Sequence, residues 1–152
     1  MKVELKTILL AEDNPKDVEL TLEALAEYNL ANRVVVVHDG VETLEYLRRE
    51  GQFKDRAPGD PAVLLLDIKM PRMDGLEVLR EIRADKALHT LPVVILSSSS
   101  EERDLLTGYE LGVNAYVVKP VDFGEFMDAA RVLGQFWAIV NEVPPTGSGN
   151  GS

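Results

Sequence analysis

The chain has 152 residues, of which 45% are apolar and 28% are charged, a balance typical of one globular domain with its own core. Its formal net charge of −10 argues against nonspecific binding to nucleic acid or to an anionic membrane, because both need a basic surface. The absence of cysteine excludes disulfides and thiolate metal sites. Since the sequence also has no signal-like segment and no apolar run of about 18 residues, it predicts a cytoplasmic protein.

Five short apolar runs are predicted strands, and a predicted helix follows each of them. The strands are expected at residues 7–11, 34–37, 62–66, 93–96 and 115–118. The helices are expected to begin at Asn14-Pro15, Asp39, Asp74, Ser99 and about Asp122, where capping residues precede helical spacing. The first is expected to end near residue 29, the fourth near 111 and the last near 141, while residues 51–61 read as a long loop.

This alternation predicts an α/β domain of the doubly wound kind, a five-stranded parallel sheet with helices on both faces. The domain is expected to span residues 1–143. The remaining residues, 144–152, are rich in proline, glycine and serine and are predicted to form a disordered tail.

The stretch from Ala62 to Gly75 is the most informative part of the chain. Its apolar run leads directly into Asp67 and then into a turn, so Asp67 is expected at the carboxyl end of a buried strand. Ligands gather at that edge in open α/β sheets. The alternative is that Asp67 merely caps the helix near Gly75, but Asp74 is better placed for that purpose.

Polar side chains with possible chemistry follow four of the five predicted strands. They are Glu12 and Asp13, Asp67, Ser97 and Lys119. Taken singly, each has a simpler explanation: an acidic pair favours a helix dipole, a serine often caps a helix, and a lysine is usually a surface charge. These explanations do not account for the arrival of all of them at one edge of the sheet.

Three adjacent carboxylates repel one another, which raises their pKa values unless a cation lies among them. Carboxylate ligands without histidine or cysteine suit Mg²⁺ better than zinc. With a metal and Lys119 beside it, Asp67 could act as a nucleophile towards a phosphoryl group, and Ser97 could donate a hydrogen bond to that group.

These residues resemble the receiver domain of two-component response regulators, over nearly the whole chain to about residue 137. The matching segments are Glu12-Asp13, Asp67, residues 70–75, Leu96-Ser97 and Lys119-Pro120. Their spacing also matches, because Ser97, Tyr116 and Lys119 lie 30, 49 and 52 residues after Asp67. The resemblance implies a flavodoxin-like receiver fold, with Asp67 accepting a phosphoryl group from a phosphohistidine on a sensor histidine kinase.

The resemblance also implies functions for the neighbouring residues. Glu12, Asp13, Asp67 and the main-chain carbonyl of Lys69 would bind Mg²⁺. Lys119 and Ser97 would hold the phosphoryl group. Tyr116 and Ser97 would act as the switch that changes the surface of the fourth helix, fifth strand and fifth helix. The protein would be a signalling protein that assists its own phosphorylation and dephosphorylation, and not an enzyme.

Two residues depart from the usual receiver pattern. Glu12 replaces the commoner aspartate, and its extra methylene is compatible with binding the metal through water. Lys69 places a cation near the approach of an attacking water, which predicts a changed lifetime of the phosphoryl group.

The loop at 51–61 and the aromatic-rich end resemble small regulators that are paired with bacterial phytochrome-type kinases. The expected kinase-facing residues, by analogy with the family, are Lys16, Pro120, Val121 and Phe123.

A second apolar stripe on the last helix, at 132, 136, 139 and 143, predicts a homodimer; the alternative is a wide stripe buried within the monomer. Because no output domain follows, a stand-alone receiver is expected.

Three other functions are considered. A Mg²⁺-dependent aspartyl-phosphate phosphatase of the dehalogenase type would need a second aspartate where Lys69 stands. A flavin carrier would share the fold but would need a phosphate-binding loop where Glu12 and Asp13 stand, since these carboxylates repel phosphate. A phosphorelay shuttle, which passes its phosphoryl group on to another protein, stays open.

Overall fold

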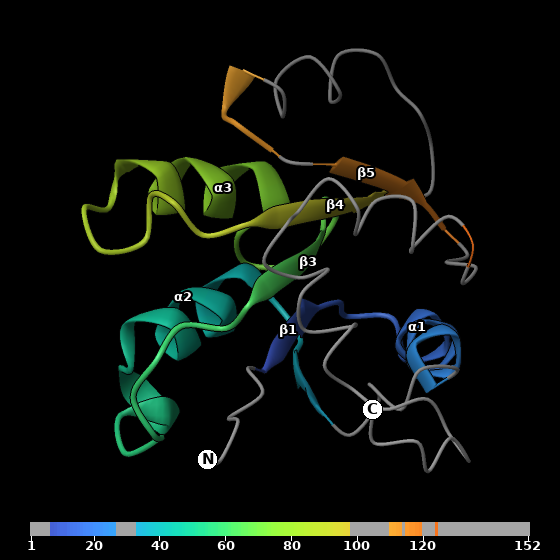
Figure 1. Cartoon of the computed structure of the whole chain (residues 1–152), viewed down its shortest axis with the longest axis horizontal. Coiled ribbons are helices and arrows are strands. Elements are labelled where there is room, and N and C mark those ends of the chain that lie inside the picture. The colour runs from blue at the N-terminus through green and yellow to red at the C-terminus, as the bar shows by residue number, and fades with distance from the viewer. Residues whose placement is uncertain (1–6, 27–32, 98–109, 114, 120–123, 125–152) are drawn as a thin grey trace, which may run out of the picture.

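The structure, a computed structural model, describes residues 7–26, 33–97, 110–113, 115–119 and 124. Its five strands form one parallel sheet in the order β2-β1-β3-β4-β5 (Figure 1). The strands are β1 (Ile8–Ala11), β2 (Val34–Val37), β3 (Val63–Asp67), β4 (Val93–Ser97) and β5 (Ala115–Val118). This order is a doubly wound one whose direction reverses between β1 and β3, where ligands bind in such sheets. The predicted five-stranded parallel sheet is therefore confirmed.

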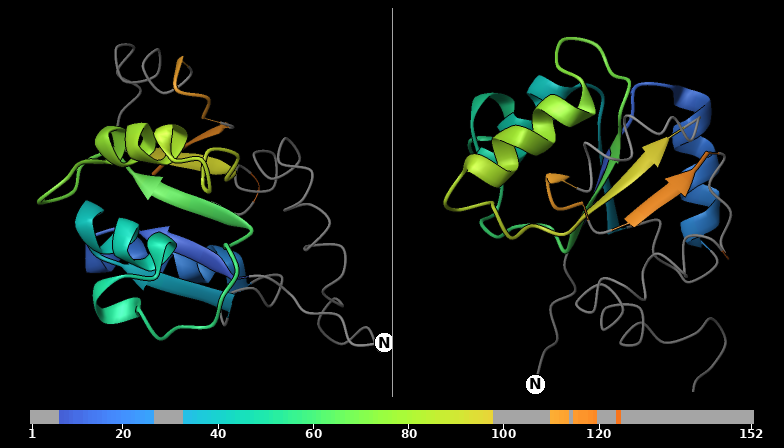
Figure 2. Two further views of the ribbon diagram at one scale, coloured as in Figure 1. Left: turned by 90° about the vertical axis from the view of Figure 1, so that its left-hand side faces the viewer. Right: turned by 90° about the horizontal axis from the view of Figure 1, so that it is seen from above.

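Helices cover both faces of this sheet. They are α1 (Pro15–Ala26), α2 (Gly40–Arg48) and α3 (Gly75–Ala84). Helix α1 lies on one face, while α2 and α3 pack together on the other (Figure 2). Nearly all of the predicted fourth helix, the predicted last helix with its second apolar stripe, and the tail lie outside the described residues, as do Pro120, Val121 and Phe123. In the described part of the chain, no helix has the length and apolar character needed to cross a membrane.

The core explains why the strand sequences are apolar without alternation. The residues of β1 and the apolar parts of β3 and β4 are fully buried, because helices pack on both faces of the central strands. Alternate strand residues such as Leu9, Leu64 and Ile95 belong to the cluster formed with α2 and α3. Strand β2 is at the edge of the sheet, and only Val37 in it is buried.

Helix starts follow the capping residues found in the sequence. The side chain of Asn14 accepts hydrogen bonds from the backbone N–H of Lys16 and Asp17, so it caps α1 as predicted. Asp74 caps α3 and forms a complete capping box with Glu77. Asp67 is therefore not the cap of α3, and the simpler explanation of that carboxylate is removed.

The segment predicted as a plain loop contains a short 3-10 helix, η2 (Gly51–Phe53), which packs against α2. The rings of Phe53 and Tyr46 meet edge to face with centroids 5.0 Å apart. The guanidinium of Arg56 lies 4.1 Å from the centre of the Tyr46 ring, and its Nε donates to the Tyr46 carbonyl at 2.7 Å. These contacts order the loop, and they join α2 to residues beyond its end, where helical spacing no longer applies.

Candidate functional site

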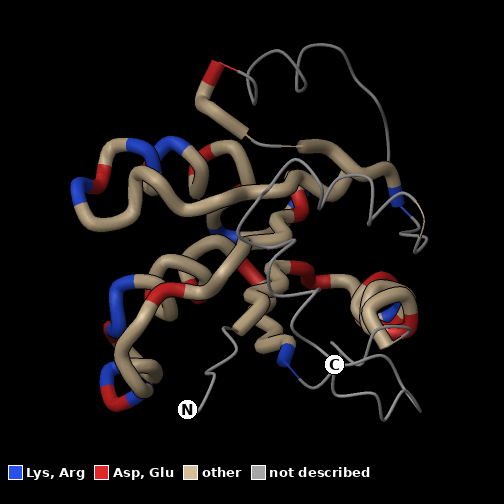
Figure 3. Tube along the Cα trace, in the orientation of Figure 1, with Lys and Arg blue, Asp and Glu red and all other residues tan. Residues whose placement is uncertain are grey.

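The sheet register brings two of the predicted site residues together. Strands β1 and β3 are paired so that Ala11 lies opposite Leu66, and Glu12 and Asp67 follow them at the carboxyl edge. Figure 3 shows acidic residues along this edge, directly after the end of β1. Asp67 is the last residue of β3 and is only 4% exposed, so it lies at the base of the site and not on the outer surface.

Three carboxylates meet at this edge. Glu12 is fully buried, Asp67 is nearly so and Asp13 is exposed. One oxygen from each of the three lies within 4.8 Å of the others. A set of hard oxygen ligands with one member facing solvent suits a divalent cation such as Mg²⁺ that keeps part of its water shell. The donor set therefore fits the metal that was expected from the sequence.

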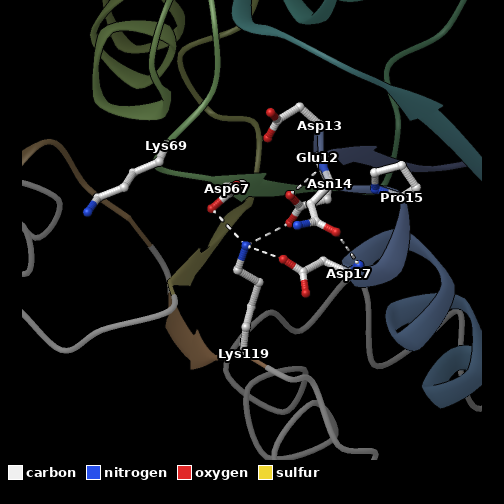
Figure 4. A pocket seen from close by; sticks show the side chains of 8 residues that line it. All are labelled: Glu12, Asp13, Asn14, Pro15, Asp17, Asp67, Lys69 and Lys119. Carbon is white, nitrogen blue, oxygen red and sulfur yellow. Dashed lines mark hydrogen bonds and ion pairs between the residues drawn. The ribbon is translucent and has the colours of Figure 1, made fainter.

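Lys119 follows β5, and its side chain reaches into this cluster. Nζ lies 3.0 Å from Glu12 Oε1, 2.9 Å from Asp17 Oδ2 and 3.3 Å from Asp67 Oδ1 (Figure 4). The side chain is only 9% exposed, so Lys119 is not the surface charge of the simpler explanation. Burial alone would lower the pKa of this ammonium, but the hydrogen bonds to Asp17 and Glu12 and the charge of Asp67 outweigh burial and raise it. Lys119 is therefore a permanent positive charge in the site.

Glu12 has an unusual protonation equilibrium. Burial is the largest cause that raises its pKa, and the charge of Asp67 adds to the effect. The hydrogen bond from Lys119 and one from the backbone N–H of Asn14 oppose it, yet the pKa of Glu12 still rises to about 7. The sequence predicted a raised pKa from repulsion between carboxylates; in the structure, desolvation contributes more than repulsion.

These side chains line a pocket of about 520 Å³ that opens to solvent. The lining residues are Glu12, Asp13, Asn14, Pro15, Asp17, Asp67, Lys69 and Lys119. In Figure 4 the side chain of Lys69 extends away from the carboxylates, and this residue is exposed. The pocket therefore presents carboxylates and one buried ammonium to a polar ligand, with a second cation at its rim.

The turn after β3 packs closely against the strand end that carries Asp67. The backbone N–H of Gly75 donates to the carbonyl of Ile68 at 2.7 Å. A Cβ atom at position 75 would lie 2.3 Å from the Asp67 carbonyl oxygen, so only glycine fits there. The start of α3 thus fixes the backbone around the candidate nucleophile.

The same turn is attached to the start of α2 by a charged pair. Arg72 has a left-handed backbone with φ of 66°, which is uncommon for a residue with a side chain. Its Nε and one terminal nitrogen donate to the two carboxylate oxygens of Asp39 at 3.0 and 3.1 Å. This bidentate pair holds the segment that follows Lys69, whose carbonyl is the fourth expected metal ligand.

Ser97 lies on β4, which is next to β3 in the sheet, and Tyr116 lies on β5, the strand beyond β4. Ser97 ends β4 at the carboxyl edge and is buried, and its carbonyl accepts a hydrogen bond from the backbone N–H of Lys119 at 2.8 Å. Tyr116 lies opposite Ile95 in the register, is partly buried and packs against the core. The structure therefore brings Ser97 to the predicted edge and places Tyr116 one strand away.

Asp17 is the pocket residue that the sequence analysis missed. It lies in the first turn of α1, where an acidic residue is common because it favours the helix dipole. Its contact with Lys119 spans 102 residues of sequence. A capped helix start directly after Glu12 and Asp13 was the available signal that a first-turn side chain would face the site.

The sequence of this chain is similar to those of known response regulators. A family model described as the response regulator receiver domain matches residues 8–131. Response regulator Rcp1 of Synechocystis sp. (strain ATCC 27184 / PCC 6803 / Kazusa) is 33% identical over 139 residues, which cover 91% of this chain and 93% of Rcp1.

Solved structures agree with this match. The bacteriophytochrome response regulator RtBRR is 55% identical with a TM-score of 0.83, and the match covers 97% of this chain and 89% of RtBRR. The phosphorylated cyanobacterial phytochrome response regulator RcpA is 37% identical with a TM-score of 0.71, over 92% of this chain and 94% of RcpA. The Mn²⁺-bound form of Rcp1 is 31% identical with a TM-score of 0.69, over 90% of this chain and 91% of that one. The fold, the carboxylate–lysine site and these matches together show that the chain belongs to the response regulator receiver domain family.

Proposed function

We propose that this response regulator accepts a phosphoryl group on Asp67 from a phosphohistidine of a sensor histidine kinase. One observation supports Asp67 as the acceptor residue. The buried Asp67 carboxylate lies 3.3 Å from the ammonium of Lys119 and within reach of the carboxylates of Glu12 and Asp13. A nucleophile between a fixed cation and a set of metal ligands is the arrangement that phosphoryl transfer needs, because positioning and charge neutralisation supply most of the catalysis.

The transfer forms one bond and breaks one. A carboxylate oxygen of Asp67 attacks phosphorus, and the bond between phosphorus and the imidazole nitrogen breaks, with its electron pair remaining on that nitrogen. Lys119 donates to one phosphoryl oxygen and the hydroxyl of Ser97 to another. The product is an aspartyl phosphate on this protein and a free histidine on the kinase.

The resident metal is proposed to be Mg²⁺, held by Glu12, Asp13, Asp67 and the carbonyl of Lys69. When bound, it neutralises charge on the phosphoryl oxygens. The three carboxylates whose oxygens lie within 4.8 Å of one another support this choice, as does the similarity to the Mn²⁺-bound form of Rcp1. Both ions are hard cations that take oxygen ligands.

The proposed partner is a phytochrome-type histidine kinase. The high identity to RtBRR, described as a bacteriophytochrome response regulator, supports this pairing. The kinase would approach over the exposed Lys16, beside the pocket.

We also propose that the protein forms a homodimer through its last helix, on the basis of the second apolar stripe in the sequence. A monomeric mass in light scattering at tens of micromolar protein, with and without a phosphoryl mimic, would contradict the dimer.

The phosphatase function is not favoured. Such an enzyme would need a general acid two residues after its nucleophile, and the residue there is Lys69, whose exposed side chain extends away from Asp67 (Figure 4).

The assignment of Asp67 is tested by phosphorylation in vitro with Mg²⁺ and acetyl phosphate. Intact-protein mass spectrometry is expected to show one acid-stable, base-labile phosphoryl group on the wild type. The same group is expected on Asp60→Asn, which removes an exposed carboxylate outside the pocket, and not on Asp67→Asn. Equal modification of Asp67→Asn would overturn the assignment. A purified phytochrome-type kinase that does not transfer its phosphoryl group to the wild type would reject the proposed partner.

A further inference from the structure

Asp17 has no part in the function described so far, although it is one of three carboxylates that contact Lys119. Its distance from Nζ, 2.9 Å, is the shortest of the three. A lysine ammonium has three N–H donors. Hydrogen bonds to Glu12 and Asp17 use two of these donors, while Asp67 contacts Nζ as an ion pair at 3.3 Å.

A phosphoryl group on Asp67 changes this arrangement. The phosphoryl group takes over the Asp67–Lys119 contact, because the carboxylate that carries it is no longer charged. Its oxygens accept a further N–H of Lys119 only if Glu12 or Asp17 releases one. The side chain of Asp17 is 26% exposed, compared with 0% for Glu12 and 6% for Asp67. A partly exposed carboxylate regains water when its ion pair opens, whereas a buried one is left as an uncompensated charge. Release of Asp17 is therefore the least costly exchange.

The position of Asp17 fits this exchange. Its backbone is fixed by hydrogen bonds to the side chains of Asn14 and Thr21 at the start of α1. In Figure 4 it approaches Lys119 from α1, while Asp13 lies on the opposite side of the site. Among the described residues, the carboxylates whose oxygens could surround one cation are Glu12, Asp13 and Asp67, so Asp17 can leave Lys119 without disturbing that group.

We propose, resting on the phosphoryl-acceptor function above, that Asp17 is a positioning residue that competes with the phosphoryl group for Lys119. In the unphosphorylated protein, Asp17 holds the ammonium at the pocket. Phosphorylation replaces the Asp17–Lys119 pair with a phosphoryl–Lys119 pair. A neutral residue at position 17 therefore strengthens the binding of a phosphoryl group, since Glu12 and Asp67 still keep Lys119 in the site.

The test measures binding of beryllofluoride, a noncovalent phosphoryl mimic, by calorimetry at saturating Mg²⁺. The dissociation constant is expected to fall about three- to tenfold in Asp17→Asn, the effect of losing one partly exposed charge-assisted contact. Glu19→Gln is the matched control, because it removes the same charge from an exposed position on α1. Glu19→Gln and the charge-retaining Asp17→Glu are both expected to stay within about twofold of the wild type.

An unchanged or higher dissociation constant in Asp17→Asn would overturn the inference, and so would an equal fall in Glu19→Gln. Urea unfolding of each variant checks the fold; a poorly folded Asp17→Asn would be replaced by Asp17→Ser in the same assay. If the wild type binds beryllofluoride no better than Asp67→Asn, the acceptor function itself is wrong and the inference falls with it. Tight, Asp67-dependent binding that is insensitive to position 17 would reject the inference alone.

Discussion

The raised pKa of Glu12 predicts a stability that decreases as the pH rises in the absence of metal. This carboxyl group has an ordinary pKa of 4.5, and in the folded protein the pKa is about 7. Between these two values the folded state binds the proton and the unfolded state does not. The folded state is therefore favoured by protonation of Glu12 at low pH and loses that advantage as the pH rises through about 7.

The size of this effect follows from the change in pKa. A rise from 4.5 to about 7 corresponds to about 3 kcal/mol, because each pKa unit is worth about 1.4 kcal/mol. Its physical source is mainly the burial of an ionised carboxylate, which Lys119 and the N–H of Asn14 compensate only in part. Other carboxylates also contribute to the pH dependence, so the perturbation must isolate Glu12.

The substitution Glu12→Gln removes this titration while it keeps the size of the side chain. The free energy of unfolding is measured in urea at pH 5 and pH 8, with EDTA present, for both proteins. Because pH 5 already lies above the ordinary pKa of 4.5, the wild type is expected to lose most of this free energy, about 2 to 3 kcal/mol, relative to Glu12→Gln between pH 5 and pH 8. Excess Mg²⁺ should reduce this difference, since a bound cation favours the ionised form.

Parallel pH profiles for the two proteins in EDTA would refute the reasoning. They would mean that the Glu12 carboxylate is solvated well enough to titrate normally, despite its full burial in the structure.

Four further predictions concern the rest of the site. Lys119→Gln leaves the Glu12 and Asp67 carboxylates without their ammonium, so the free energy of unfolding in urea is expected to fall by about 3 kcal/mol without metal. Mg²⁺ should stabilise this variant more than it stabilises the wild type, and an unchanged free energy of unfolding would contradict the ion pairs. Gly75→Ala places a Cβ against the Asp67 carbonyl, so the free energy of unfolding should fall by about 2 kcal/mol and the Mg²⁺ affinity should fall as well. Wild-type values for both quantities would show that the turn shifts freely. Arg72→Gly should be more stable than Arg72→Ala by about 1 kcal/mol, because both lose the pair with Asp39 but only alanine keeps the left-handed strain; equal melting temperatures would argue against that strain. Lys69→Ala should change the autodephosphorylation rate, because it removes the cation at the pocket rim. Equal rates in the variant and the wild type would contradict an effect of Lys69 on the lifetime of the phosphoryl group.

Local chemistry made much of this protein predictable. Asn14 and Asp74 cap helices through contacts with residues two or three positions away, so their pattern is visible in a short window of sequence. The strand that ends in Asp67 was predicted from its apolar run, although its boundaries moved by one residue. Because parallel strands end at one edge, the meeting of Glu12, Asp67 and Lys119 followed from the fold alone.

Contacts between distant residues were not predictable in this way. The pair between Arg72 and Asp39 joins residues 33 positions apart, and η2 is ordered by the stacking of Arg56 on Tyr46. No helical or strand period links such positions, so only the packed chain reveals them.

The sequence by itself determined which residues reach the carboxyl edge, because strand direction and alternation with helices leave few other arrangements. The tertiary structure alone decided how those residues act on one another. It buried Glu12 so deeply that desolvation controls its pKa, and it turned Asp17 towards Lys119. Both effects depend on solvent exclusion and on distances of about 3 Å between segments far apart in sequence, which arise only when the whole domain is packed.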